Sequence, residues 1–198
     1  MLFTDRMVGT LDFYDSDPEG YSSETFCSDV SEIRDRFLRH VPDHGRILDL
    51  GCGSGRDTLF FIGKGYDAVP ADGSAGMCAI AERNLGFPVR RLLFSELDYG
   101  GEFDAVWACS SLLHVPSADL PGVLAGIRRA LKGNGILFMC FKKGDSEGFR
   151  DSRWFTDMSL DRLVSLCREN SFEPLESWES FEERRGIVWC NAIAKLLS

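Results

Sequence analysis

Short apolar runs alternate with amphipathic stretches along most of the chain. The apolar runs predict five strands, at residues 46–50, 66–71, 89–94, 103–108 and 134–142. Between them, apolar residues recur every three to four positions, which predicts helices near 56–63, 75–84 and 118–132. Strands that alternate with helices are typical of a parallel sheet, so an α/β fold is expected.

Both ends of the chain depart from this alternation. Residues 9–22 are polar and rich in turn formers, and apolar residues at helical spacing predict a helix near 23–40. Ser159 is expected to cap a helix that runs to about 169, because its hydroxyl can accept a hydrogen bond from a free amide. Two further strands, separated by a polar hairpin-like interval, are expected at 172–179 and 187–196.

The first predicted strand leads into a glycine-rich turn. Residues 46–57 read RILDLGCGSGRD, an apolar strand that ends in an acid and continues into GxGxG. Such glycines let the backbone turn sharply and approach a ligand at the carboxyl end of a strand. A dinucleotide-binding loop would have GxGxxG, but Arg56 replaces the third glycine, and no Gly-Lys-Ser/Thr follows as in a P-loop. Both of these phosphate-binding alternatives are therefore disfavoured.

Two later segments complete a pattern. Residues 66–77, YDAVPADGSAGM, form a short strand ending in an acid, Asp72, at the distance from the first glycine where a ribose-binding carboxylate is expected. Residues 102–115, EFDAVWACSSLLHV, look like a fourth strand and its following loop. With the glycine turn, these segments resemble the class I S-adenosylmethionine-dependent methyltransferases over roughly residues 45–145.

The resemblance implies a fold and a domain organisation. The expected fold is a Rossmann-like, doubly wound α/β sheet of seven strands, in the order 3-2-1-4-5-7-6, with an antiparallel last strand. One methyltransferase domain would span residues 1–198, with an N-terminal lead and helix at 1–44 and the Rossmann-like core at 45–198.

The resemblance also implies S-adenosylmethionine as the cofactor and gives residues roles in holding it. Asp72 would accept both ribose hydroxyls, and Asp49 would orient the glycine loop or meet the amino group through water. Arg56 would hold the carboxylate, or is instead a surface residue of a helix. The other cofactor-binding candidates are Gly51, Cys52, Gly53, Gly55, Gly73, Met77, Phe94, Ser95 and Ala108, whose carbonyl would face the amino group.

The adenine contact departs from the pattern of many relatives, which place an aspartate at the end of the third strand. Leu93 occupies that position here. Adenine would then be held by the backbone around Phe94 and Ser95, or by Glu96 from a shifted loop. Met77 would flank the ring with its thioether, although a helix position facing the sheet suits it equally.

The acceptor pocket is expected beside the loop after the fourth strand. His114 lies there and is either a general base for the acceptor or a structural histidine bonded to the backbone. Tyr14 and Tyr21 would cover the pocket as a lid or serve as plain hydrophobic anchors. Arg153, Arg184 and Arg185 would bind an anionic acceptor such as a carboxylate or phosphate, or are solvated surface residues.

Composition narrows the function. A net charge of −9 argues against nucleic-acid binding through a broad basic surface. A small-molecule acceptor is therefore favoured. A tRNA or protein methyltransferase and a non-catalytic cofactor-binding protein remain open as alternatives. The apolar runs are too short to span a bilayer. The seven cysteines contain no CxxC pair, so neither a metal site nor a disulfide framework is expected, and a reducing cytoplasm fits best. The oligomeric state is left open.

Overall fold

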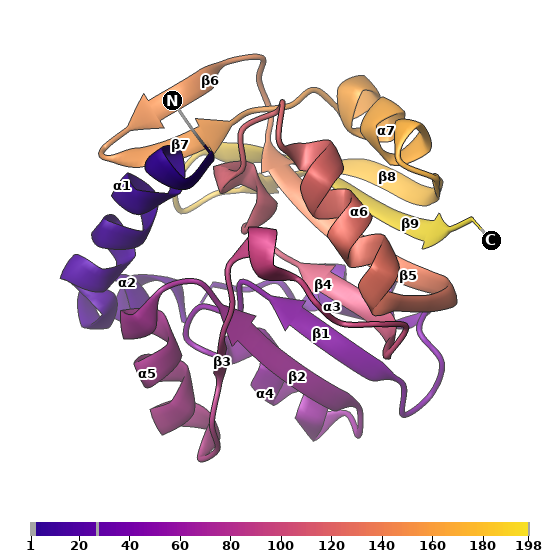
Figure 1. The fold of residues 1–198 in the computed structure, drawn as a ribbon, viewed down its shortest axis with the longest axis horizontal. Coiled ribbons are helices and arrows are strands. Elements are labelled where there is room, and N and C mark those ends of the chain that lie inside the picture. The colour runs from indigo at the N-terminus through magenta and orange to yellow at the C-terminus, as the bar shows by residue number, and fades with distance from the viewer. Residues whose placement is uncertain (1–2, 27, 198) are drawn as a thin grey trace.

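A computed structural model describes residues 3–26 and 28–197, with side chains from residue 8 onward; Cys27, within the predicted 23–40 helix, lies outside the described residues. A seven-stranded sheet of order β3-β2-β1-β4-β5-β9-β8 forms its centre (Figure 1). The strands are β1 (Arg46–Leu50), β2 (Asp67–Asp72), β3 (Arg90–Arg91), β4 (Phe103–Ala108), β5 (Leu131–Lys142), β8 (Phe172–Glu182) and β9 (Ile187–Leu196).

The topology confirms the predicted sheet. Counted in chain order, these seven strands give the order 3-2-1-4-5-7-6. The first five pair in parallel, and β9 is antiparallel to both β5 and β8. The carboxyl ends of β1, β2 and β4 therefore meet at one edge, where ligands bind in open α/β sheets.

The helices flank this sheet. They are α1 (Phe3–Ser16), α2 (Pro18–Thr25), α3 (Ser31–Leu38), α4 (Arg56–Gly63), α5 (Ala75–Leu85), α6 (Leu120–Ala130) and α7 (Leu160–Glu169). In Figure 1, α6 lies in front of the sheet and α4 behind it. Ser159 caps α7 as predicted, because its hydroxyl accepts a hydrogen bond from the Arg162 amide.

An aromatic cluster holds the central strands and two helices together. Trp107 of β4 stacks on Phe138 of β5 with ring centroids 4.2 Å apart. Phe37 of α3 and Phe61 of α4 pack against Trp107 at 5.0 and 5.4 Å. All four side chains are fully buried, so the middle of the sheet forms a rigid base for the loops at its edge.

The N-terminal prediction was wrong in part. The lead at residues 9–22 is not a set of turns but belongs to α1 and α2, and the helix expected at 23–40 is divided into the end of α2, at 23–25, and α3. Asp17 starts α2 by accepting the Gly20 amide, with Pro18 in the first helical turn. The Asp-Pro pair is a helix start signal, and α1 packs against α5, so tertiary contacts favour helix in a polar segment.

Two strand predictions also needed correction. The strand expected at 89–94 shortens to β3, because the chain leaves the sheet edge after Arg91 and forms a 3₁₀ turn at Phe94–Glu96. An unpredicted hairpin joins β6 (Glu147–Arg150) to β7 (Arg153–Thr156). Its two turn residues, Asp151 and Ser152, both have positive φ, 48° and 67°, as a tight two-residue hairpin requires.

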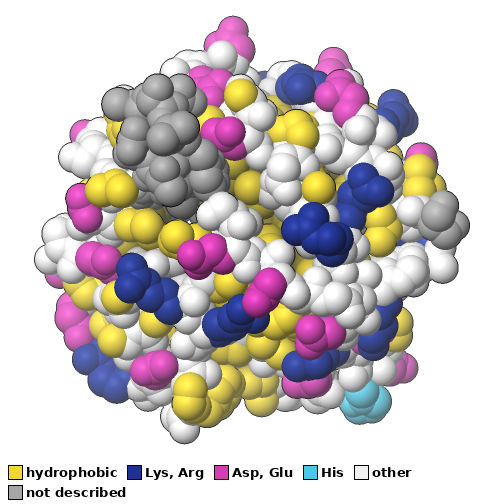
Figure 2. All heavy atoms as spheres, in the orientation of Figure 1, with side chains coloured by type: hydrophobic (Ala, Val, Ile, Leu, Met, Phe, Trp, Pro, Cys, Tyr) yellow, Lys and Arg dark blue, Asp and Glu magenta, His cyan; other side chains and the backbone are white. Residues whose placement is uncertain are grey.

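The surface carries mixed charge. On the face shown in Figure 2, Lys and Arg side chains are interspersed with Asp and Glu and do not gather into one basic patch. Within residues 3–26 and 28–197, no helix has the length and apolar character needed to cross a membrane.

Candidate functional site

A cavity of about 680 Å³ lies at the carboxyl edge of the sheet. The glycine turn and the loops after β2 and β4 form one side, and α1, α2 and the β8–β9 turn form the other. Most of the predicted site residues line it, namely Tyr14, Tyr21, Gly51, Cys52, Gly53, Arg56, Asp72, Gly73, Met77, Phe94, His114, Arg184 and Arg185. Among the described residues, the predicted candidates that do not line it are Asp49, Gly55, Ser95, Ala108 and Arg153.

The glycine turn has a backbone that only glycine adopts easily. Gly51, Gly53 and Gly55 have φ of 82°, 54° and 81°. A Cβ on Gly51 would lie 2.4 Å from the Cβ of Ser111, whose hydroxyl donates to the Leu50 carbonyl at 2.7 Å. The turn and the loop after β4 are therefore in direct contact, and Ser111 is a site residue that the sequence did not reveal.

Asp72 joins two loops at the end of β2. Its carboxylate accepts hydrogen bonds from the Gly53 and Ser74 amides, both at 2.9 Å. Burial raises the pKa of Asp72 above its ordinary value, against the lowering effect of these amides. These bonds use only part of the acceptor capacity of the carboxylate, and the rest remains for a ligand that donates hydrogen bonds.

The loop after Asp72 also contacts the N-terminal segment. Ser74 donates from its hydroxyl to the Asp15 carboxylate at 2.5 Å, and the Gly76 amide donates to the same oxygen at 2.8 Å. Asp15 lies at the end of α1 and therefore holds the start of α5 beside Asp72. Sequence reasoning missed Asp15, because 59 residues separate it from its partner Ser74.

Asp49 lies behind the glycine turn. It is buried and accepts a hydrogen bond of 2.6 Å from the Thr58 hydroxyl in α4. Burial first, and the nearby charge of Asp57 second, raise the pKa of Asp49 to about 8. Its position fits a residue that orients the turn better than one that touches a ligand directly.

A buried carboxylate at the start of α4, that of Asp57, contacts two arginines and a tryptophan. Asp57 accepts from Arg56 through both of its oxygens at 2.9 Å, and from the indole N–H of Trp107 at 2.9 Å. Arg34 of α3 is more distant, at 3.4 Å. The sequence analysis missed Asp57, because its bond to the buried indole N–H, which requires an acceptor, joins residues 50 positions apart.

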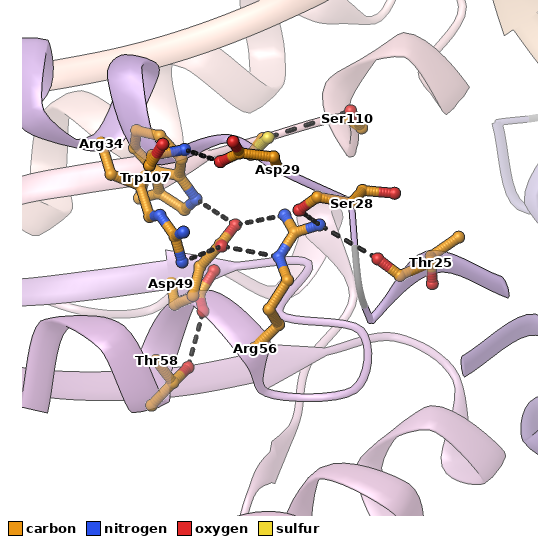
Figure 3. Close-up of polar contacts among 12 residues, drawn as sticks. Thr25, Ser28, Asp29, Arg34, Asp49, Arg56, Thr58, Trp107 and Ser110 are labelled. Atoms are coloured by element: carbon orange, nitrogen blue, oxygen red, sulfur yellow. Dashed lines mark hydrogen bonds and ion pairs between the residues drawn. The ribbon is translucent and has the colours of Figure 1, made fainter. Parts of the chain in front are cut away.

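Arg56 is largely occupied by the protein. Besides Asp57, its guanidinium donates to the carbonyls of Thr25 at 3.2 Å and Ser28 at 3.4 Å, as Figure 3 shows. Four of its five N–H donors are thereby directed to protein oxygens. Arg56 is therefore not a solvated helix residue, and at most one donor remains for a ligand in the cavity.

The slot expected to hold adenine is apolar. Met77, with 2% of its surface exposed, lines it together with Leu92, Leu93 and Phe94. Glu96, the alternative adenine partner, instead accepts the amide of Leu93 at 3.3 Å and is not among the lining residues that are described.

His114 is held by hydrogen bonds on both ring nitrogens. Nδ1 lies 2.7 Å from the carbonyl of Trp154, which can only accept, so the proton resides on Nδ1. Nε2 lies 2.8 Å from the hydroxyl of Tyr14 and therefore accepts from it. Burial, assisted by the charge of Arg153, lowers the pKa of His114 to about 4. The imidazole is neutral near pH 7, and its basic nitrogen is occupied.

The acceptor side of the cavity combines aromatic rings and arginines. Tyr14 and Tyr21 meet edge to face, with centroids 4.8 Å apart and planes at 85°. Arg185 forms a two-bond pair with Glu182, at 2.5 and 2.7 Å, and Arg184 donates to the Glu24 carbonyl at the end of α2. Both arginines therefore have protein partners already.

Comparison with known proteins agrees with this arrangement. Residues 47–135 match the family described as "Methyltransferase domain". The chain is 34% identical over 122 residues to a glycine/sarcosine N-methyltransferase of Parasynechococcus marenigrum, covering 56% of this chain and 43% of that protein. It is 32% identical over 138 residues to an uncharacterized methyltransferase of Synechocystis sp., covering 68% and 59%. The chain thus spans about half the length of these curated relatives.

Solved structures share the fold. The 1,6-didemethyltoxoflavin-N1-methyltransferase of Burkholderia thailandensis, which binds 1,6-didemethyltoxoflavin and S-adenosylhomocysteine, aligns with a TM-score of 0.83 at 20% identity, covering 100% of this chain and 92% of that one. The [4+2]-cyclase SpnF aligns with a TM-score of 0.67 at 20% identity, covering 84% of this chain and 81% of that one. The family match, the sheet order and the glycine turn followed by Asp72 together support a class I S-adenosylmethionine-dependent methyltransferase.

Proposed function

We propose that this chain transfers the methyl group of S-adenosylmethionine to a small-molecule acceptor. The observation that carries the proposal is one cavity with two chemically different sides. Gly51, Gly53 and Asp72 form a side suited to the cofactor, while Tyr14 and Tyr21 form a side suited to a second molecule. A shared cavity allows the two reactants to meet, and such positioning supplies much of the acceleration in methyl transfer.

The residues present fit the cofactor. The remaining acceptor positions of Asp72 suit the two hydroxyls of a ribose, and the slot at Met77, Leu93 and Phe94 suits adenine. Backbone groups of the glycine turn and of Ala108 would meet the amino-acid end, with the one remaining donor of Arg56 on its carboxylate. When bound, the cofactor supplies an electrophilic methyl group on sulfonium.

The chain's own residues would position both reactants and exclude water. Asp49 and Thr58 fix the glycine turn from behind. His114 fixes the hydroxyl of Tyr14, so that its ring stands at the cavity wall. A neutral amine needs no general base for attack, which suits a site whose only nearby imidazole is occupied.

Two observations support a small acceptor. Relatives are named for small acceptors, glycine or sarcosine and 1,6-didemethyltoxoflavin. The visible face of the chain shows mixed charge (Figure 2) and the net charge is −9, which does not favour RNA. A member of the same fold is named as a cyclase, so cofactor binding alone would not establish transfer.

The test has two stages. Calorimetry should show binding of S-adenosylhomocysteine and no comparable binding of NAD; the reverse result would remove the cofactor assignment. Methyl-labelled cofactor is then incubated with the protein and a fractionated cell extract, and label is expected in the small-molecule fraction. Label in RNA or protein would favour the tRNA or protein alternative, and binding without any transfer would favour the non-catalytic one.

A further inference from the structure

Three cationic side chains surround one buried aromatic ring beside the cavity. Phe155 of β7 has the ammonium of Lys142 at 4.1 Å from its ring centroid, and the guanidinium carbons of Arg150 and Arg153 at 4.4 and 5.1 Å. Lys142 ends β5, whereas both arginines come from the β6–β7 hairpin. The hairpin that the sequence did not predict therefore brings these charges together.

The positive charge in this cluster is only partly neutralised. Arg150 is paired through two nitrogens with Asp157, at 3.0 and 2.6 Å. Among the described side chains, from residue 8 onward, no carboxylate lies within ion-pair distance of Lys142 or Arg153. Burial, followed by repulsion from Arg150 and Arg153, lowers the pKa of Lys142 below its ordinary value. Like charges held together at a half-buried position destabilise each other, and an anion would relieve this.

The cluster adjoins the acceptor side of the cavity. The ring of Phe155 packs on His114 with centroids 4.9 Å apart, and His114 lines the cavity. Arg153 covers the ring of Phe13 at 4.0 Å and interacts with the hydroxyl of Tyr14, a second lining residue. A small molecule that touches Tyr14 thus lies next to Arg153, and Lys142 shares the ring of Phe155 with Arg153.

We propose that Lys142 and Arg153 form the binding site for an anionic group, a carboxylate or phosphate, of the methyl acceptor. This assignment rests on the proposed function and changes the expected anion-binding residues. Arg153, Arg184 and Arg185 were all expected to bind the anion, but the guanidinium groups of Arg184 and Arg185 are bound to the Glu24 carbonyl and the Glu182 carboxylate. The proposal keeps Arg153 and replaces the other two by Lys142. The sequence analysis assigned Lys142 no acceptor-binding role, because only the tertiary structure places it beside Arg153.

The experiment measures how inorganic phosphate and acetate shift the thermal unfolding of the whole chain, against chloride at equal ionic strength. Lys142→Met removes one cation and keeps the aliphatic stem over Phe155. Lys143→Met is the matched control, because Lys143 is exposed and paired with Glu179 at 2.8 Å. A second variant, Arg153→Met, tests the other cation.

Phosphate should stabilise the parent and Lys143→Met more than chloride does, and acetate should do so more weakly. The phosphate dissociation constant should rise about tenfold in Lys142→Met, the usual scale for losing one charge-assisted contact. Without phosphate, Lys142→Met should unfold at the same or a higher temperature than the parent, because repulsion is relieved; a purely structural lysine would give a lower one.

Three results would overturn the assignment. The first is that phosphate stabilises the parent no more than chloride does, and the second is that phosphate affinity is unchanged in both Lys142→Met and Arg153→Met. The third is that Lys143→Met loses as much phosphate affinity as Lys142→Met does. Binding of S-adenosylhomocysteine is measured in parallel and should be the same in all variants. Phosphate binding without cofactor binding would contradict the proposed function and leave the anion site standing. Cofactor binding without phosphate binding would contradict only the anion site.

Discussion

The hydroxyl of Tyr14 donates a hydrogen bond to Nε2 of His114 at 2.8 Å. Tyr14 comes from α1 and His114 from the loop after β4, so this bond ties the N-terminal segment to the centre of the sheet. The same bond changes the role expected for His114. A histidine that the sequence offered as a general base has its only basic nitrogen occupied, and the carbonyl of Trp154 holds its proton on Nδ1.

We therefore predict that His114 does not titrate between pH 5.5 and 8. The pKa of His114 is lowered to about 4, below the ordinary 6.5, so the unfolded state takes up the proton first as pH falls. The contribution of His114 to stability is present above pH 6.5 and is lost as the pH falls toward 4. NMR of labelled histidine measures this directly, and a chemical-shift midpoint near pH 6.5 for His114 would contradict the buried, neutral ring.

Tyr14→Phe should remove the donor to Nε2 and keep the ring. Loss of this bond should lower the free energy of unfolding by about 1 kcal/mol, and binding of S-adenosylhomocysteine should be unchanged. The measurement is denaturant unfolding beside calorimetry. Tyr66→Phe is the control, since Tyr66 lies away from the cavity and has no hydrogen bond from its hydroxyl to His114 in the described structure; equal effects of the two changes would argue against a special role for Tyr14.

Asp49→Asn should flatten the pH dependence of stability on the alkaline side. The pKa of Asp49 is raised to about 8, so the folded state retains a proton that the unfolded state has lost. Its contribution to stability is full below about pH 4 and is lost as pH rises through about 8. An asparagine cannot ionise and can still accept from Thr58. The free energy of unfolding, measured from pH 5 to 9, should fall less steeply for the variant than for the parent. Parallel curves would show that another group titrates.

Asp72→Ala should weaken binding of S-adenosylhomocysteine by roughly 1.5–3 kcal/mol, because hydrogen bonds to a charged group are lost. Asp67→Ala is the matched control, since Asp67 begins the same strand and its side chain is 65% exposed. Calorimetry on both variants makes the comparison. An unchanged affinity in Asp72→Ala would remove this acid from the cofactor site.

Gly51→Ala should destabilise the chain by roughly 2–4 kcal/mol, from a left-handed backbone conformation and from overpacking. The backbone φ is 82°, and the added carbon would lie 2.4 Å from the Cβ of Ser111. Gly63→Ala provides the comparison, because nothing lies within 4 Å of its added carbon at the end of α4. Denaturant unfolding should show a large loss for the first change and no loss for the second.

Local patterns in the sequence were sufficient for several elements. Ser159 caps its helix because a serine and the amide it binds are three residues apart. β4 has the predicted bounds because its largely apolar run begins after Glu102 and the chain becomes polar at Ser110 and Ser111. The turn from Gly51 to Gly55 was recognisable because its backbone demands glycines at fixed positions.

Other features depended on partners that are distant along the chain. Polar residues of α1 and α2 form helices that pack on α5 and β7, which propensity alone does not show. The two-residue turn of the β6–β7 hairpin contains no glycine, so its positive φ angles left no sequence signal. Asp57 could be recognised as a structural residue only from the fold, which brings the indole of Trp107, 50 residues away in the chain, within hydrogen-bond distance.

The sequence by itself determined the seven strands of the main sheet, the helices from α4 to α7, the glycine turn and the acid that ends β2, because each depends on residues close together in the chain. Only the tertiary structure decided the state of His114, the occupied donors of Arg56, Arg184 and Arg185, and the unneutralised charges of Lys142 and Arg153. Hydrogen bonding, burial and charge compensation depend on neighbours in space, and folding brings those neighbours together from opposite ends of the chain.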